Sequence, residues 1–227
     1  MNKLGLVVVF FGCCVLTALP AAAVVVDFED TGPFPNISAT ITSGGFDFIP
    51  ADGTVATMFN GGSCFPSCAA NGTATFIAGG IALNPPTIHP VTMLSSTGFA
   101  FFLTALDFAE FVGADEEFDA TDLNATQIVM TGNLAGGGTV SQTLFLDGLN
   151  DGPGGFNDFQ TAVLLPFWAS STLSSLEFVG FNDTQSPTTP RGFQLDNIHV
   201  DQVPEPGTMA LLGLGLISLG FRRARSR

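Results

Sequence analysis

The chain has few basic residues and no tyrosine, and both shortages limit what it can do. Its 227 residues contain 6 Lys plus Arg against 20 Asp plus Glu, a formal net charge of −14. Between Val24 and Val203 there are 19 acidic residues and one basic residue, Arg191, so this segment carries −18. Such a surface repels phosphate and attracts cations. This charge argues against nucleic acid as a partner.

Side chains for catalysis are also scarce. The body between the two ends has two histidines, His89 and His199, and no lysine. A serine hydrolase needs a serine on a sharp turn beside a histidine base, and the G-x-S-x-G pattern of such a turn is absent. The histidines lack the spacing of zinc ligands. We therefore expect no enzyme activity, with paired carboxylates for glycoside cleavage as the remaining alternative.

The body has the pattern of an all-β domain. The hydrophobic fraction of the chain, 46%, is too high for a disordered chain, and in the body short β-rich runs alternate with glycine-rich turns. This pattern predicts one domain, residues 24–202, folded as a two-sheet antiparallel sandwich of the jelly-roll kind. The expected strands are Val24–Glu29, Ile37–Thr42, Thr54–Phe59, Thr73–Ile77, Val91–Ser95, Phe99–Phe111, Thr126–Thr131, Thr139–Leu146, Thr161–Leu165, Leu173–Phe181 and Phe193–Val200.

Residues 1–23 have the pattern of a secretory signal peptide. Lys3 precedes an apolar run from Leu4 to Leu19, and three alanines end at Ala23, where a peptidase needs small side chains. We expect a signal helix that is cleaved after Ala23 by signal peptidase during export. An uncleaved anchor, or a lipoprotein modified at Cys13, is the alternative.

The C-terminal segment, residues 203–227, has three parts in order. The motif Val203-Pro204-Glu205-Pro206 is followed by an uncharged run from Met209 to Phe221. As a helix this run is about 20 Å long, short for a hydrocarbon core of about 30 Å. A basic tail that would stay cytoplasmic and stop transfer closes the chain with Arg222, Arg223, Arg225 and Arg227.

These three parts resemble the PEP-CTERM sorting signal of Gram-negative, exopolysaccharide-producing bacteria, a tail also catalogued as an ice-binding protein C-terminal domain. The resemblance implies recognition and cleavage near the motif by exosortase, a membrane protease. It implies export through the inner membrane, transient anchoring by the C-terminal helix, and delivery to the cell surface or extracellular matrix. An ordinary C-terminal membrane helix is the alternative.

The last expected strand changes phase at Asp196-Asn197, which predicts a β-bulge. The segment from Gly192 to Ile198 also resembles the closing strand of exported jelly rolls related to carbohydrate-binding modules. In those folds an acid of this strand and an acid of the first strand hold a structural calcium ion. The resemblance therefore implies a calcium site at Glu29 and Asp196.

Other candidate sites are weaker. The segment from Asp147 to Asp158 spaces some of its oxygens as a calcium loop does, but Leu149 stands where a ligand is needed, so a plain hairpin loop is favoured. Cys64 and Cys68 are expected to form a disulfide in an oxidising compartment. A metal site is their alternative.

Trp168 is the only tryptophan of the chain. We expect it in the core, although an exposed ring could serve as a platform for a sugar. The function predicted from the sequence is a structural or adhesive surface protein. The alternative is a carbohydrate-binding module for the cell's own exopolysaccharide, which an exposed Trp168 would favour and a buried one would not.

Overall fold

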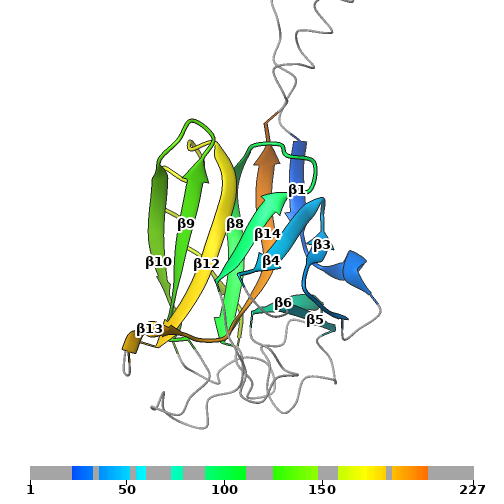
Figure 1. The fold of residues 1–227 in the computed structure, drawn as a ribbon, viewed down its shortest axis with the longest axis vertical. Helices are drawn as coiled ribbons and strands as arrows, with labels where there is room; N and C mark the ends of the chain where they lie inside the picture. Colours follow the sequence, from blue (N-terminus) through cyan, green and yellow to red (C-terminus); the bar gives the residue numbers. More distant parts are fainter. Residues whose placement is uncertain are drawn as a thin grey trace, which may run out of the picture. The chain divides into compact units, whose positions relative to one another are not determined.

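Short strands make up almost all of the regular structure (Figure 1). The computed structural model describes residues 22–32, 36–51, 55–59, 73–78, 90–110, 125–147, 158–182 and 186–203. The elements in chain order are β1 (Ala22–Val26), the 3-10 helix η1 (Glu29–Thr31), β2 (Asn36–Ser38), β3 (Ile41–Ser43), β4 (Phe46–Pro50), β5 (Val55–Phe59), β6 (Ala74–Ala78), β7 (Val91–Ser95), β8 (Phe101–Glu110), β9 (Gln127–Leu134), β10 (Thr139–Phe145), β11 (Gln160–Thr161), β12 (Leu173–Asn182), β13 (Ser186–Pro190) and β14 (Phe193–Gln202).

Every strand pairing is antiparallel, which confirms the predicted all-β fold. The 14 strands form one continuous sheet rather than the two separate sheets that we expected. Its main path runs β2-β5-β6-β14-β8-β12-β7-β4-β3, and β9 and β10 extend from β12. A single pair of residues, Leu173 and Phe101, joins β12 to β8. That pairing is why the two halves of the expected sandwich are hydrogen-bonded to each other.

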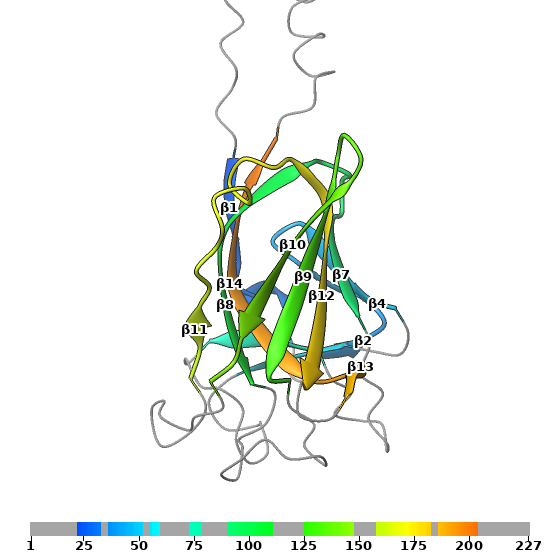
Figure 2. The same cartoon turned by 90° about the vertical axis from the view of Figure 1, so that its left-hand side faces the viewer.

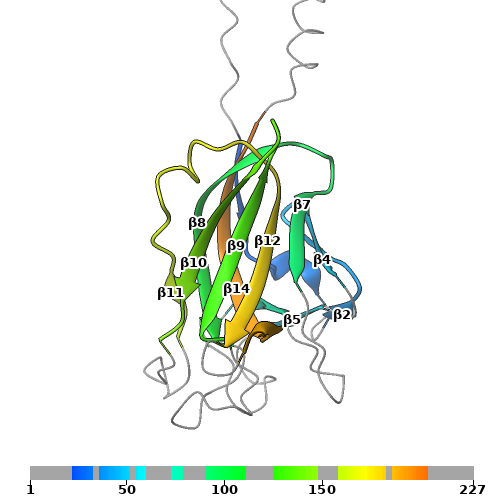
Figure 3. The same cartoon turned by 60° about the vertical axis from the view of Figure 1, so that its left-hand side comes forward.

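The sheet nearly closes beside β10 (Figures 2 and 3). The chain after β11 bonds to β8 on one side, where the Ala162 amide donates to the Leu106 carbonyl at 2.9 Å. On the other side it meets the Gln142 side chain of β10, which donates to the Val163 carbonyl at 2.8 Å and accepts from the Leu165 amide at 3.0 Å. A side-chain amide thus takes the place of a strand pairing between β8 and β10.

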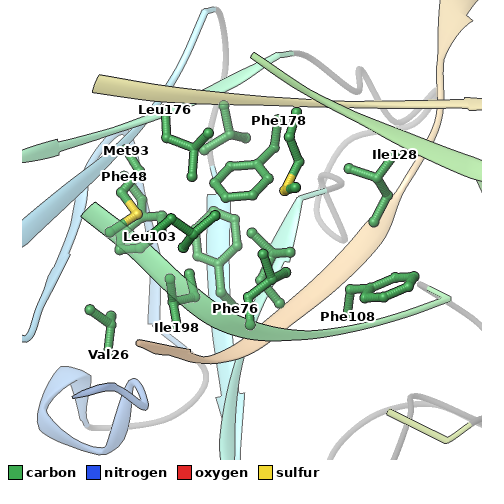
Figure 4. Packing of buried hydrophobic residues seen from close by; sticks show 14 of the residues in the cluster. Val26, Phe48, Phe76, Met93, Leu103, Phe108, Ile128, Leu176, Phe178 and Ile198 are labelled. Atoms are coloured by element: carbon green, nitrogen blue, oxygen red, sulfur yellow. The ribbon is translucent and has the colours of Figure 1, made fainter. Parts of the chain in front are cut away.

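The core lies between the two halves of the sheet (Figure 4). Strands such as β12 bury every second side chain there, as expected for a sheet with one covered face. Three phenylalanines, Phe28, Phe48 and Phe76, form a triangle with ring centroids 5.0 to 5.5 Å apart. Aromatic pairs at this separation add stability beyond the burial of their area. All three rings are fully buried.

Several strand boundaries differ from the prediction. The expected strand Ile37–Thr42 is two short strands, β2 and β3, which pair with different partners, β5 and β4. The strand Thr161–Leu165 is shortened to β11, because residues beyond Thr161 bond to the Gln142 side chain instead of a strand.

Two strands were missed altogether. β4 and β13 each end in a proline, and a proline within a β-rich run argues against a strand in sequence reasoning. β13 pairs only with β12, so its outer edge needs no amide donor.

The first and last strands lie side by side. β1 pairs with β14 from Ala22 opposite Gln202 to Val26 opposite Ile198. The first and last residues of the described unit therefore lie at the same end of these two strands. The expected signal helix and C-terminal helix lie outside the described residues. In the part of the chain that the structure describes, no helix is long and apolar enough to cross a membrane.

Candidate functional site

The predicted bulge in β14 is present. The register against β8 shifts between Asp196 and His199, and Asn197 has a φ of 46°, in the left-handed region. Asparagine tolerates this conformation better than most residues. The bulge turns the Asp196 carboxylate so that its Oδ1 accepts the backbone amide of Asn197 at 2.7 Å. His199, beyond the bulge, is exposed.

The carboxylates of Glu29 and Asp196 both contact the start of β6. The Thr73 hydroxyl donates to Asp196 Oδ2 at 2.9 Å, and the amide of the next residue, Ala74, donates to Glu29 Oε1 at 2.7 Å. Asp196 is fully buried, whereas Glu29 is exposed. A buried carboxylate keeps its charge at tolerable cost only when donors or a cation surround it. The Thr73 hydroxyl and the Asn197 amide are two donors to the Asp196 carboxylate.

The residue before Glu29, Phe28, has an unusual backbone conformation. Phe28 has a φ of 60°, which places its ring in the phenylalanine triangle and starts η1 at the next residue, Glu29. Its amide donates to the Ser43 hydroxyl at 3.2 Å. A bulky residue in the left-handed region is strained, and such strain often marks a functional position.

Sequence reasoning missed a third carboxylate in this region. Asp107 on β8 lies opposite Asp196, and its Oδ2 accepts the Asn197 side-chain amide at 3.0 Å. Its Oδ1 accepts the Thr161 hydroxyl at 2.7 Å. The register of β8 against β14 reveals this residue, and no spacing in the sequence links positions 90 residues apart.

The oxygen atoms at Glu29 and Asp196 are of the kind that calcium binds. They are carboxylate and hydroxyl oxygens, and calcium takes six to eight oxygen ligands. Among the described residues no group of three or more His, Cys, Asp or Glu is placed to hold a metal ion. An ion at this pair would therefore need backbone and hydroxyl oxygens for most of its coordination.

Trp168 lies in the core, as we predicted. Its side chain is fully buried, and its indole Nε1 donates to Gln142 Oε1 at 2.7 Å. Gln142 is the one polar residue on an otherwise apolar face of β10, and the indole explains why the core tolerates it. The ring is therefore not a platform for a sugar.

Other predicted positions lie outside the described residues. These are Cys64 and Cys68, His89, and the interior of the loop between Asp147 and Asp158. The disulfide stays a prediction.

The C-terminal motif begins directly at the folded sheet. Gln202 ends β14, and the amide of Val203 donates to the Ala100 carbonyl at 2.8 Å. Pro204, Glu205 and Pro206 follow without a linker, outside the described residues. A family model described as the PEP-CTERM protein-sorting motif matches residues 202–225.

The chain carries a PEP-CTERM sorting motif. This confirms the resemblance on which the expected sorting rests, because the match spans the proline motif, the apolar run and most of the arginine tail. The motif implies export, processing by exosortase and sorting to the cell surface. It covers a small part of the chain, so it does not describe the sheet that precedes it.

The body resembles a carbohydrate-binding module, again as expected, but distantly. One similar solved structure is titled "CBM29-2 mutant D114A: Probing the Mechanism of Ligand Recognition by Family 29 Carbohydrate Binding Modules". It shares 12% sequence identity, with 82% of this chain and 87% of that chain covered and a TM-score of 0.34. At this TM-score the likeness does not establish a common fold. No curated protein matches the chain.

Proposed function

We propose that this chain is a non-catalytic structural or adhesive protein that exosortase processing delivers to the cell surface or extracellular matrix. The observation that carries the proposal is the sorting motif that follows β14 without a linker. The motif supplies the destination. The body has two histidines, one arginine, no lysine and no tyrosine, and this scarcity of nitrogen bases supports a role without catalysis.

The arrangement of the ends supports sorting of a folded body. Because β1 and β14 pair, the proposed signal-peptide cleavage site after Ala23 and the sorting motif leave the same edge of the sheet. Cleavage after Ala23 keeps Val24, Val25 and Val26 paired with β14. Both processing steps then trim the chain without breaking into the phenylalanine core.

The test of this function is to change the signal and follow the protein. Glu205→Gln, or deletion of residues 222–227, should leave the protein in the inner membrane, where cell fractionation and mass spectrometry of its termini detect an unprocessed tail. Asp201→Asn is the matched control, an acid-to-amide change just upstream of the proline motif. Normal maturation of both signal variants would refute the proposal.

Carbohydrate binding is the alternative function, since the similar structure is a carbohydrate-binding module by its title. The buried indole of Trp168 removes the only tryptophan from consideration as a sugar platform. Binding of the mature protein to the producer's purified exopolysaccharide, measured by affinity electrophoresis, would favour this alternative over a purely structural role.

We also propose that calcium is the structural ion of the body, held by Glu29 and Asp196. Support comes from the shared strand end that positions both carboxylates and from the two strained residues beside them, Phe28 and Asn197. The ion would reduce the repulsion within a body that carries −18. It would also fasten η1, which follows the first strand, to the last strand.

A further inference from the structure

The bond that signal peptidase is expected to cut lies inside a strand pairing. Cleavage after Ala23 breaks the peptide bond to Val24, and both residues belong to β1. In the folded sheet their partners on the neighbouring β14 are Asp201 and Val200 (Figure 1). The pairing starts one residue before Ala23 and continues for two residues beyond Val24. Paired residues therefore enclose the cleavage site on both sides.

A protease needs this segment free of β14. Hydrolysis adds one water across the bond and leaves a carboxylate on Ala23 and an amino group on Val24. The nucleophile must reach the carbonyl carbon and donors must reach the carbonyl oxygen, so the cleft of the enzyme has to surround an extended segment. In the folded body β14 occupies one side of that segment. Cleavage of a folded chain can then occur only in the fraction of molecules in which β1 has opened.

Packing also holds β1 in place. Val26 is fully buried, and a Cβ atom at Gly44 would lie 3.0 Å from Val26 Cγ2 and 3.4 Å from Val24 Cγ1. The turn between β3 and β4, which contains Gly44, thus lies directly against β1. Two residues after Val26, the ring of Phe28 is fully buried in the phenylalanine triangle. Opening β1 must therefore separate it from this turn as well as from β14.

The strand that encloses the cleavage site is the last one of the body. A chain that is exported from its N-terminus, as the proposed function requires, brings β14 out after every other strand. A pairing between segments so far apart in sequence also forms late in folding, because a long loop must close first. The cleavage site therefore stays unpaired until the whole body has crossed the membrane.

The sorting motif differs from the N-terminal site in its relation to the sheet. β14 ends at Gln202, and the amide of Val203 adds one more bond, to the Ala100 carbonyl. The motif continues with Pro204 and, two residues later, Pro206. Proline has no amide hydrogen, so the strand ladder cannot continue through the motif in the same way.

We propose that the fold of the body sets the order of its two processing steps. Signal peptidase cuts before β1 pairs with β14, and exosortase cuts after the sheet has closed. The proposal rests on the proposed function, from which it takes both enzymes. A chain that folds first shields the bond between Ala23 and Val24 and keeps its signal peptide. A chain that is cut first closes the sheet with Val24 as its first residue and with the sorting motif beyond the end of β14.

Cleavage of the full-length precursor by purified signal peptidase in detergent micelles tests the protection. One sample meets the enzyme while it refolds from denaturant, and a second sample meets it after refolding is complete. Mass spectrometry measures how fast chains that begin at Val24 appear. The refolded precursor should be cut at least about tenfold more slowly, because cleavage follows the population of the open form. Equal rates for the two samples overturn the proposal.

Two neighbouring glycines supply a matched pair of variants. Gly44 and Gly45 have φ values of 56° and 80°, so alanine strains the turn at either position. The new Cβ meets β1 only at Gly44, because at Gly45 it has nothing within 4 Å. Gly44→Ala should loosen β1 and speed cleavage of the refolded precursor by about threefold or more, whereas Gly45→Ala should keep the wild-type rate. Equal rates for the two variants contradict the proposal. If Gly44→Ala does not fold, as judged by circular dichroism, the wild-type comparison decides.

Pulse–chase labelling in the producing cells tests the order itself. Chains that begin at Val24 and still carry the tail should appear first, and chains without the tail should follow. Chains that have lost the tail but kept the signal peptide overturn the proposed order. If the tail is never cut, the proposed sorting fails, whereas the protection of the N-terminal site is decided separately by the purified precursor.

Discussion

At the scale of single residues, Gln142 shows how one polar side chain closes a sheet. Its amide acts as a peptide group would, with one donor and one acceptor for the backbone of the neighbouring segment. Its Oε1 also accepts the buried indole of Trp168. The sequence identifies Gln142 as the polar exception on β10. Its three partners lie 21 to 26 residues away, at distances in sequence that no local pattern reports.

Gln142→Ala should lower the free energy of unfolding by about 1–3 kcal/mol, because the buried indole N–H of Trp168 loses its acceptor. Urea unfolding of the mature protein measures the change, and the emission of the only tryptophan should shift to longer wavelength if water reaches the ring. Thr143→Ala, the next residue of β10, is the control and should change the free energy by about 0.5 kcal/mol or less. Equal losses for the two variants would contradict the role of Gln142.

At the scale of elements, β14 shows what a sequence pattern reveals and what it omits. The slip in alternation after Leu195 predicts the bulge, because a period-two pattern can change phase only where a residue is inserted. The bulge has two partners: Thr73, the residue before β6, and Asp107 on β8. Strand order in the sheet places them there, and a single sequence does not encode that order in any local spacing.

The same limit explains the errors in the fold. Period-two runs identify most strands, since burial alternates along them. They do not reveal which strands pair, so the expected two sheets become one through the contact of Leu173 with Phe101. The predicted end of the first strand, Glu29, is wrong for a local reason. Phe28 has a left-handed backbone, so β1 ends at Val26, and nothing in the residue type signals that conformation.

The bulge gives a prediction with an internal comparison. Asn197→Gly and Asn197→Ala both lose the bond to Asp107, but alanine also meets the left-handed backbone with a Cβ. Asn197→Ala should therefore be less stable than Asn197→Gly by about 1 kcal/mol or more in urea unfolding. At His199, an exposed position of the same strand, the order should reverse, because glycine weakens a regular strand by about 0.5–1 kcal/mol. The same order at both positions would show that the left-handed backbone does not decide stability here.

At the scale of the whole molecule, charge and chain ends meet at one place. The body carries −18, and its first and last strands pair with each other. The Glu29 and Asp196 carboxylates both contact the start of β6. A calcium ion that binds only the folded state stabilises it by about 2.7 kcal/mol at a hundredfold excess over its Kd. Thermal melts of the mature protein should thus move to higher temperature with millimolar calcium and return with chelator.

Asp196→Asn should remove most of this calcium response, because the amide keeps the size of the side chain and lacks the charge that calcium needs. Asp201→Asn is the control, a half-buried acid on the same strand, opposite Ala23. It removes the same single negative charge at a position outside the Glu29 and Asp196 pair, so it should keep the full response. Magnesium and sodium at equal ionic strength screen the charges as calcium does but do not suit the site, so their effects should be smaller than that of calcium. If magnesium matches calcium and both variants respond as the wild type does, the stabilisation is general screening, and Glu29 and Asp196 do not form a calcium site.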